Sequence, residues 1–144
     1  FARRIVNSGR LSVPATLSES PLNTPDADAF AGTVAPGAVL PDAPLTRQGH
    51  ATWLLRALGP DFTLLVFGPA PAWAAALPHV QVLQIGVDVQ DALGLAAQRL
   101  DARPGTAYLL RPDQHVCARW RALEETAVRA ALARATAHED HRPC

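Results

Sequence analysis

Hydrophobic and polar positions divide the sequence into an irregular first third and a periodic remainder. Residues 1–46 show no sustained helical stripe, and the prolines that recur there remove backbone donors and restrict the residues that precede them. This segment has too few large apolar side chains to fold alone, which predicts an extended, proline-rich N-terminal arm. The arm is expected to lie on the body of the domain or on a part of the polypeptide outside this sequence, or to stay mobile.

From residue 47 onward the pattern alternates between helix and strand. Apolar side chains at helical spacing predict a helix over residues 51–58, which Gly59-Pro60 ends. Nearly continuous apolar runs at residues 62–67 and 80–87 predict two parallel strands that are covered on both faces. This alternation indicates a sheet flanked by helices.

Two more helices are predicted around these strands. A short helix at residues 73–77 separates the strands, and Asp88 or Asp91 can cap a later helix. The buried stripe of this later helix is expected to consist of Leu93, Ala96, Ala97 and Leu100.

The stretch YLLRPDQHVCARWR predicts a β-hairpin, with Pro112 and Asp113 in its turn. On its second arm, alternation places Val116, Ala118 and Trp120 on one face and His115, Cys117, Arg119 and Arg121 on the other. A last helix is expected from about residue 123, with its apolar stripe at Val128, Ala131, Leu132 and Ala135 and an ion pair between Glu125 and Arg129.

The order of predicted elements is typical of a thioredoxin-like α/β fold. The first strands are parallel because right-handed crossovers join them, and the hairpin adds antiparallel strands to form a mixed sheet. We therefore expect a thioredoxin-like domain at residues 47–144, preceded by the arm at residues 1–46.

Composition limits the partners. Thirteen basic residues balance thirteen acidic ones, so no long-range field favours nucleic acid or an anionic membrane. Prolines interrupt the most apolar stretch, which disfavours a membrane span, and two cysteines without a disulfide framework fit the reducing cytoplasm. The sequence begins without an initiator methionine or a signal-peptide pattern, so we interpret it as a fragment of a longer polypeptide.

Candidate chemistry centres on Cys117. A redox-active thioredoxin fold needs a thiol at the start of the helix that follows the first core strand, and residues 68–73 read GPAPAW there. The arginines near Cys117 leave open a reactive thiol, beside the alternative of a structural cysteine.

The remaining motifs are weaker. His138, His141 and Cys144 have a spacing that can bind a soft metal, but it also fits a polar chain end, and we assign no catalytic, cofactor-binding or metal residue. His50 and His79 are expected at the surface or as caps. Trp120, between two arginines, is expected in the core rather than in a nucleic-acid stacking platform.

Five segments, taken together and in order, resemble one family. They are RRIVNSGRLS, SPLN, PGAVLPDAPL, FTLLVFG and the hairpin YLLRPDQHVCARWR. The chain is similar to the C-terminal, thioredoxin-like domain of FAD-dependent aromatic-ring hydroxylases of the phenol hydroxylase and 3-hydroxyphenylpropionate hydroxylase type. Two departures stand out: the family commonly has glycine at the position of Gln114 and often has alanine at that of Cys117.

The resemblance implies a parent flavoprotein monooxygenase that hydroxylates an aromatic substrate with NAD(P)H and O2. FAD and NAD(P)H are then bound outside this fragment, which packs against N-terminal FAD and substrate domains and supports a homodimer. Its role is accessory, and it is catalytically silent alone. Two alternatives stay open: a stand-alone thiol oxidoreductase or sensor that uses Cys117, and a small-molecule binding module with a pocket beneath the arm.

Overall fold

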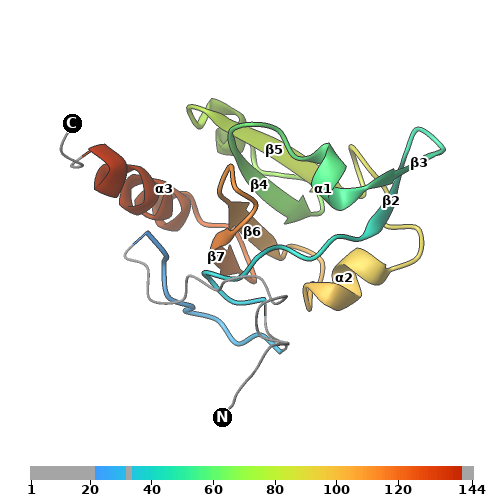
Figure 1. The fold of residues 1–144 in the computed structure, drawn as a ribbon, viewed down its shortest axis with the longest axis horizontal. Helices are drawn as coiled ribbons and strands as arrows, with labels where there is room; N and C mark the ends of the chain where they lie inside the picture. The colour runs from blue at the N-terminus through green and yellow to red at the C-terminus, as the bar shows by residue number, and fades with distance from the viewer. Residues whose placement is uncertain (1–21, 32–33, 141–144) are drawn as a thin grey trace, which may run out of the picture.

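The computed structural model describes residues 22–31 and 34–140, with side chains described as far as residue 136. Its elements form a four-stranded mixed sheet, a separate two-stranded hairpin and the helices that flank them (Figure 1). In chain order they are β2 (Pro44–Arg47), β3 (His50–Trp53), α1 (Leu54–Ala57), β4 (Phe62–Phe67), the 3-10 helix η2 (Ala72–Ala76), β5 (Val80–Ile85), α2 (Leu95–Arg99), β6 (Ala107–Leu110), β7 (Val116–Trp120) and α3 (Glu125–Asp140).

The central sheet has the strand order β5-β4-β6-β7. β4 pairs with β5 in parallel, whereas β6 pairs antiparallel with both β4 and β7. Apolar side chains of alternating parity fill two core clusters, one against α3 and the other against α2 and β2. Figure 1 shows α3 on one side of the sheet and α2 with the β2–β3 hairpin on the other. The predicted α/β class with a mixed, flanked sheet is confirmed.

The helix predicted over residues 51–58 is wrong in its first half. β3 occupies this place and pairs with β2, while α1 is a single turn. Gln48 and Gly49 both have positive φ angles, 52° and 81°, as a two-residue hairpin turn requires. Leu54 donates its backbone N–H to the Ala43 carbonyl at 2.8 Å, which fixes the chain as it leaves the hairpin. Pairing with β2 therefore overrides the helical spacing of the apolar side chains.

The start of α2 is decided by Asp91. Its carboxylate accepts hydrogen bonds from the backbone N–H groups of Ala96 and Ala97, at 3.1 and 2.9 Å. Asp88, the other predicted cap, accepts instead from the N–H of Gln84 at 2.9 Å. Leu93 was expected in the buried stripe, but it precedes the helix and is 70% exposed. Gly94, in the left-handed region, separates this residue from the helix.

The last helix agrees with its prediction. Glu125 and Arg129 form the expected ion pair at 2.9 Å. Val128, Ala131 and Ala135 are buried against the sheet, and Leu132 is partly buried beside them. Among the described residues, no helix combines the length and the apolar character that crossing a membrane requires.

The described part of the N-terminal arm lies on the body of the domain. Leu40, Ala43 and Leu45 are buried in the cluster that also contains α2. Nearby backbone groups bond to the outer edge of β7: Gly37 donates to Val116 at 2.7 Å. The predicted boundary between the arm (residues 1–46) and the domain (residues 47–144) falls inside β2. This division of the chain stays a prediction.

Candidate functional site

The turn after β4 is where a thioredoxin-like fold carries its reactive thiol. Here Gly68 leaves the strand with a φ of 136°, and Pro71 precedes η2. Ala70 donates its backbone N–H to the side-chain oxygen of Gln84 at 2.8 Å, which fixes the turn to β5. The residues of this turn have no side chain that can form a thiolate, so disulfide exchange of the usual geometry has no nucleophile here.

Cys117 is buried, and its predicted face is wrong. The register of β6 against β7 moves by one residue on β6 and by two on β7, from the pair Leu110–Val116 to the pair Leu109–Ala118. Cys117 is the extra residue of this β-bulge, which breaks strict alternation. Its side chain packs with Ala118 in the cluster facing α3, away from the arginines with which it was grouped.

This environment makes Cys117 a poor nucleophile. Its side chain is fully buried, and burial raises the pKa of the thiol to about 12, although Arg111 opposes the shift. The thiolate is the species that attacks disulfides and alkylating reagents, and very little of it forms near neutral pH. The surroundings of Cys117 are those of a structural cysteine.

The two arginines of β7 tie the arm to the sheet. Arg119 is 5% exposed and forms an ion pair with Asp26 at 2.7 Å, and Arg121 pairs with Asp101 at 2.6 Å. Both guanidinium groups lie over the ring of Phe30, with their central carbons 4.3 and 3.9 Å from its centroid. These contacts satisfy the charges internally and give the arginines a structural role. Trp120 is buried on the opposite face, in the core, as predicted.

The histidines and the tail contribute no assembled site in the described part of the chain. His50 begins β3 and His79 precedes β5, and both are exposed. His138 lies in α3, but its side chain is outside the described ones, as are His141 and Cys144 altogether. Among the described residues, no group of three or more histidine, cysteine or acidic side chains is arranged to hold a metal ion.

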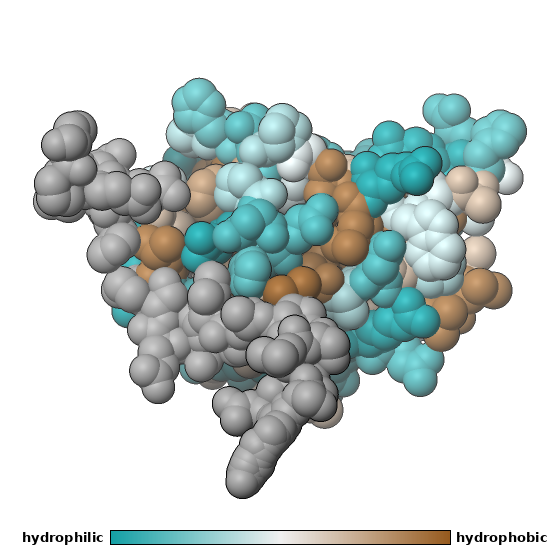
Figure 2. Space-filling view, viewed as in Figure 1, coloured by the Kyte–Doolittle hydropathy of each residue, from teal (hydrophilic) through white to brown (hydrophobic). Residues whose placement is uncertain are grey.

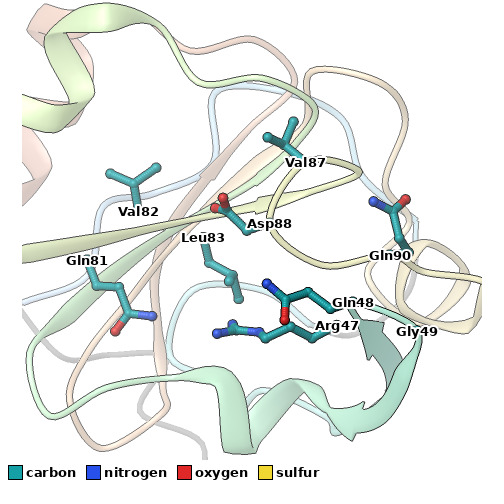
Figure 3. Close-up of a pocket in the computed structure, with 9 residues that line it drawn as sticks. All are labelled: Arg47, Gln48, Gly49, Gln81, Val82, Leu83, Val87, Asp88 and Gln90. Atoms are coloured by element: carbon teal, nitrogen blue, oxygen red, sulfur yellow. The ribbon is translucent and has the colours of Figure 1, made fainter.

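A hollow of about 690 Å³ lies beside β5, and the sequence reasoning missed it. Its walls are the β2–β3 turn and the outer side of β5 (Figure 3). Gln81 and Leu83 point toward Arg47 and Gln48, whereas Val82 points to the opposite side. The local feature that builds this wall is the Gln48-Gly49 dipeptide, whose positive φ angles form the two-residue hairpin turn.

Apolar surface is concentrated at two other places. A hollow of about 400 Å³ between α3 and the start of β4 is lined by Phe62, Leu77 and Leu132. At the end formed by the β2–β3 hairpin and the loop before α2, Trp53 and Leu93 line a hollow of about 290 Å³. Figure 2 shows hydrophobic surface at this end of the molecule. These surfaces suit contacts with protein rather than catalysis.

Comparison with known proteins gives the relatives of this architecture. A family model described as "Aromatic-ring hydroxylase, C-terminal" matches residues 33–138. No curated protein matches the sequence. The flavin-dependent monooxygenase PieE, solved in complex with FAD and substrate, superposes with a TM-score of 0.72 and 26% identity over 87% of this chain and 25% of its own.

A second solved structure supports the fold. Aklavinone-11 hydroxylase, solved with FAD and aklavinone, superposes with a TM-score of 0.68 and 21% identity over 81% of this chain and 25% of its own. The chain therefore spans about a quarter of the length of these two monooxygenases. Because the family model covers most of the sequence, from the arm to α3, the chain belongs to the aromatic-ring hydroxylase C-terminal domain family.

Proposed function

We propose that this chain is the accessory C-terminal domain of an FAD-dependent monooxygenase that hydroxylates an aromatic substrate with NAD(P)H and O2. The domain is catalytically silent by itself. It packs against the FAD and substrate domains of the same polypeptide, supports a homodimer and works in the cytoplasm. Family membership and the likeness to PieE support the enzyme class.

The main support for a catalytically silent domain is that the structure shows no accessible thiol among the described residues. Cys117, the cysteine that the structure describes, is sealed in the core, and the turn after β4 has no thiol. A thioredoxin-like fold without an accessible thiolate lacks its usual means of electron transfer. This argues against the alternative of a thiol oxidoreductase or sensor that uses Cys117. The electron transfer is then left to the flavin region of the polypeptide.

The turn after β4 also supports the proposal that FAD is bound elsewhere in the polypeptide. The turn after β4 leads into a five-residue 3-10 helix preceded by Pro71, rather than into the glycine-rich start of a long helix that holds a dinucleotide pyrophosphate. FAD, when bound elsewhere in the polypeptide, supplies the redox chemistry that activates oxygen. The part of this domain is to pack and to position.

The test separates the domain from its parent. The purified chain is titrated with FAD, and NAD(P)H oxidation is followed at the same time; we expect neither a change in flavin fluorescence nor any turnover. The polypeptide that carries this domain at its C-terminal end should bind FAD and oxidise NAD(P)H, and its dimer should weaken when residues 34–140 are deleted. Flavin bound to the isolated chain, or turnover by it, contradicts the proposal. If the chain were instead a small-molecule binding module, phenols that bind its folded state would raise its thermal unfolding midpoint.

A further inference from the structure

The hollow between α3 and the start of β4 has an apolar floor. Phe62 and Leu132 are partly buried against the core cluster that faces α3, and Leu77 is 4% exposed. The hollow measures about 400 Å³, and the residues at its rim, His79 and Arg129, are exposed. Pockets with such a lining hold the apolar anchor side chains of protein partners.

The charge at the rim does not select an ionic partner. Arg129 already forms an ion pair with Glu125 at 2.9 Å, and both side chains are close to half exposed. The hydroxyl of Thr136, on the same wall, donates to the Leu132 carbonyl at 2.8 Å. Because these polar groups have partners within α3, the hollow favours an uncharged, apolar occupant.

The N-terminal arm meets the domain beside this hollow. Leu22, where the described part of the chain begins, is buried and shares a smaller hollow of about 220 Å³ with Phe62. Thr24 then donates its backbone N–H to the Cys117 carbonyl at 2.8 Å, which holds the arm at β7. Phe62 lines the smaller hollow and the larger one, so the two are neighbours on the surface.

A second copy of the chain has no side chain placed to fill the larger hollow symmetrically. Among the described residues, the large apolar side chains that are exposed are those of Trp53, Val87 and Leu93, and none of them lines this hollow. A two-fold contact centred there would bring hollow against hollow, because symmetric copies present the same surface. Trp53 belongs to the hairpin on the side of the sheet opposite α3 (Figure 1), so its insertion would join copies head to tail.

We propose that the hollow lined by Phe62, Leu77 and Leu132 is the docking site for an apolar side chain from the catalytic part of the same polypeptide. This inference rests on the proposed function, which joins that part to the domain through the arm. The chain spans about a quarter of the length of the similar monooxygenases, so the remainder is large enough to supply the occupant. A leucine or phenylalanine side chain suits the apolar floor.

Thiol labelling tests whether the hollow is covered. Ala133 lines the hollow and is exposed, so Ala133→Cys reports on access to it. Ala130→Cys is the matched control, since Ala130 is exposed on the same helix but does not line the hollow. In a Cys144→Ser background, labelling of Ala133→Cys should be at least about 10-fold slower in the longer polypeptide than in the isolated chain, and that of Ala130→Cys should change by less than about two-fold. Peptide mass spectrometry measures each position separately.

Protein concentration separates one polypeptide from two. Cover supplied by the same polypeptide is an intramolecular contact, so the labelling rate should be the same at about 1 μM and about 100 μM protein. Cover supplied by a second copy would instead make labelling slower as the concentration rises.

Filling the hollow should displace its occupant. Ala133→Gln puts a longer side chain into the hollow from an exposed position, so the isolated chain should keep its urea midpoint. In the longer polypeptide, this substitution should speed the labelling of Thr136→Cys, another position in the hollow, to the rate seen in the isolated chain. Ala130→Gln should leave that labelling slow. Slow labelling that persists with Ala133→Gln would contradict an occupant in the hollow.

Three further results overturn the proposal: equal labelling of Ala133→Cys in the two proteins, equal slowing at Ala130→Cys, or cover that grows with concentration. The last would assign the hollow to a second copy. Because none of these measurements involves flavin, a longer polypeptide that covers the hollow but binds no FAD would refute the proposed enzyme class alone. One that binds FAD and leaves the hollow open would refute the docking site alone.

Discussion

The guanidinium carbon of Arg121 lies 3.9 Å from the centroid of the Phe30 ring. The two residues are far apart in sequence, and their contact joins the N-terminal arm to the end of β7. Arg119 lies over the same ring at 4.3 Å, and the ring meets that of Tyr108 edge to face at 6.0 Å. The aromatic ring of the arm is thus held between two cations and the core, which makes it an anchor of the arm.

Replacing this anchor should loosen the arm and destabilise the domain. Phe30→Ala removes a partly buried ring together with both cation–π contacts, and we expect the free energy of unfolding to fall by about 2 kcal/mol. Phe30→Leu keeps most of the apolar contact and should lose about 1 kcal/mol. Urea denaturation of the three proteins measures both changes. Equal losses for the alanine and leucine variants would show that the ring face contributes nothing.

Acid should weaken the second link between arm and sheet. Asp101 accepts a hydrogen bond from the backbone N–H of Ala31 at 2.6 Å and one from Arg121, and these contacts lower the pKa of its carboxyl group. Because the folded pKa lies below the unfolded value of about 3.9, this carboxylate stabilises the fold above about pH 4. The contribution disappears as the pH falls through the folded pKa.

Asp101→Asn should therefore remove part of the acid sensitivity. Unfolding free energies are compared between about pH 6 and pH 2.5, where the variant should show a shallower decline than the original protein. Asp61→Asn is the matched control, since Asp61 is exposed and forms no ion pair with the described residues. The link through Asp101 would be unimportant if both variants followed the same curve as the original.

Local signals explain why much of the fold could be predicted from sequence. The apolar run at β4 predicted a buried strand, and the turn residues of the β6–β7 segment predicted a hairpin; in both stretches no second pattern competed. Residues 51–58 failed because two patterns competed there. The helical spacing of Leu54, Leu55 and Leu58 was real, but the turn at Gln48 and Gly49 let residues 50–53 pair with β2.

The environment of Cys117 could not be predicted from the alternation of side chains along a regular strand. A β-bulge adds one residue to β7, and this single insertion exchanges the face on which the sulfur lies. The contacts of Phe30 with Arg119 and Arg121 were equally out of reach, since they join segments about 90 residues apart through charge and ring geometry. The hollow beside β5 likewise forms only when the hairpin turn lies next to the sheet edge.

Burial should protect Cys117 from reagents. In a Cys144→Ser background, alkylation of Cys117 by iodoacetamide at about pH 8 should be at least 100-fold slower than that of free cysteine, because the thiol is buried and its pKa is about 12. Denaturant should restore the ordinary rate. Fast labelling of the folded protein would show that the sulfur is reachable and would reopen the possibility of a sensor.

The same thiol should make stability fall in alkali. Its folded pKa of about 12 exceeds the unfolded value of about 8.5, so its contribution is complete below about pH 8 and decreases as the pH rises toward 12. Between about pH 7 and pH 10 we expect a loss of about 2 kcal/mol from this group. Cys117→Ala, which retains a small apolar side chain, should lack this part of the decline. Identical alkaline profiles for the two proteins would contradict the assigned burial.

The β6–β7 turn should gain stability from glycine. Gln114 has a φ of 68°, in the left-handed region where a side chain is strained, and its N–H donates to the Arg111 carbonyl at 2.9 Å. Gln114→Gly relieves the strain and should raise the free energy of unfolding by about 1 kcal/mol.

Asp113→Gly tests whether the gain comes from backbone strain. Asp113 does not have a positive φ, and its carboxylate accepts from the N–H of His115 at 3.2 Å, so glycine there should lower stability. Thermal and urea unfolding of the two variants should therefore move in opposite directions. A loss of stability in both would mean that the Gln114 side chain outweighs its backbone strain.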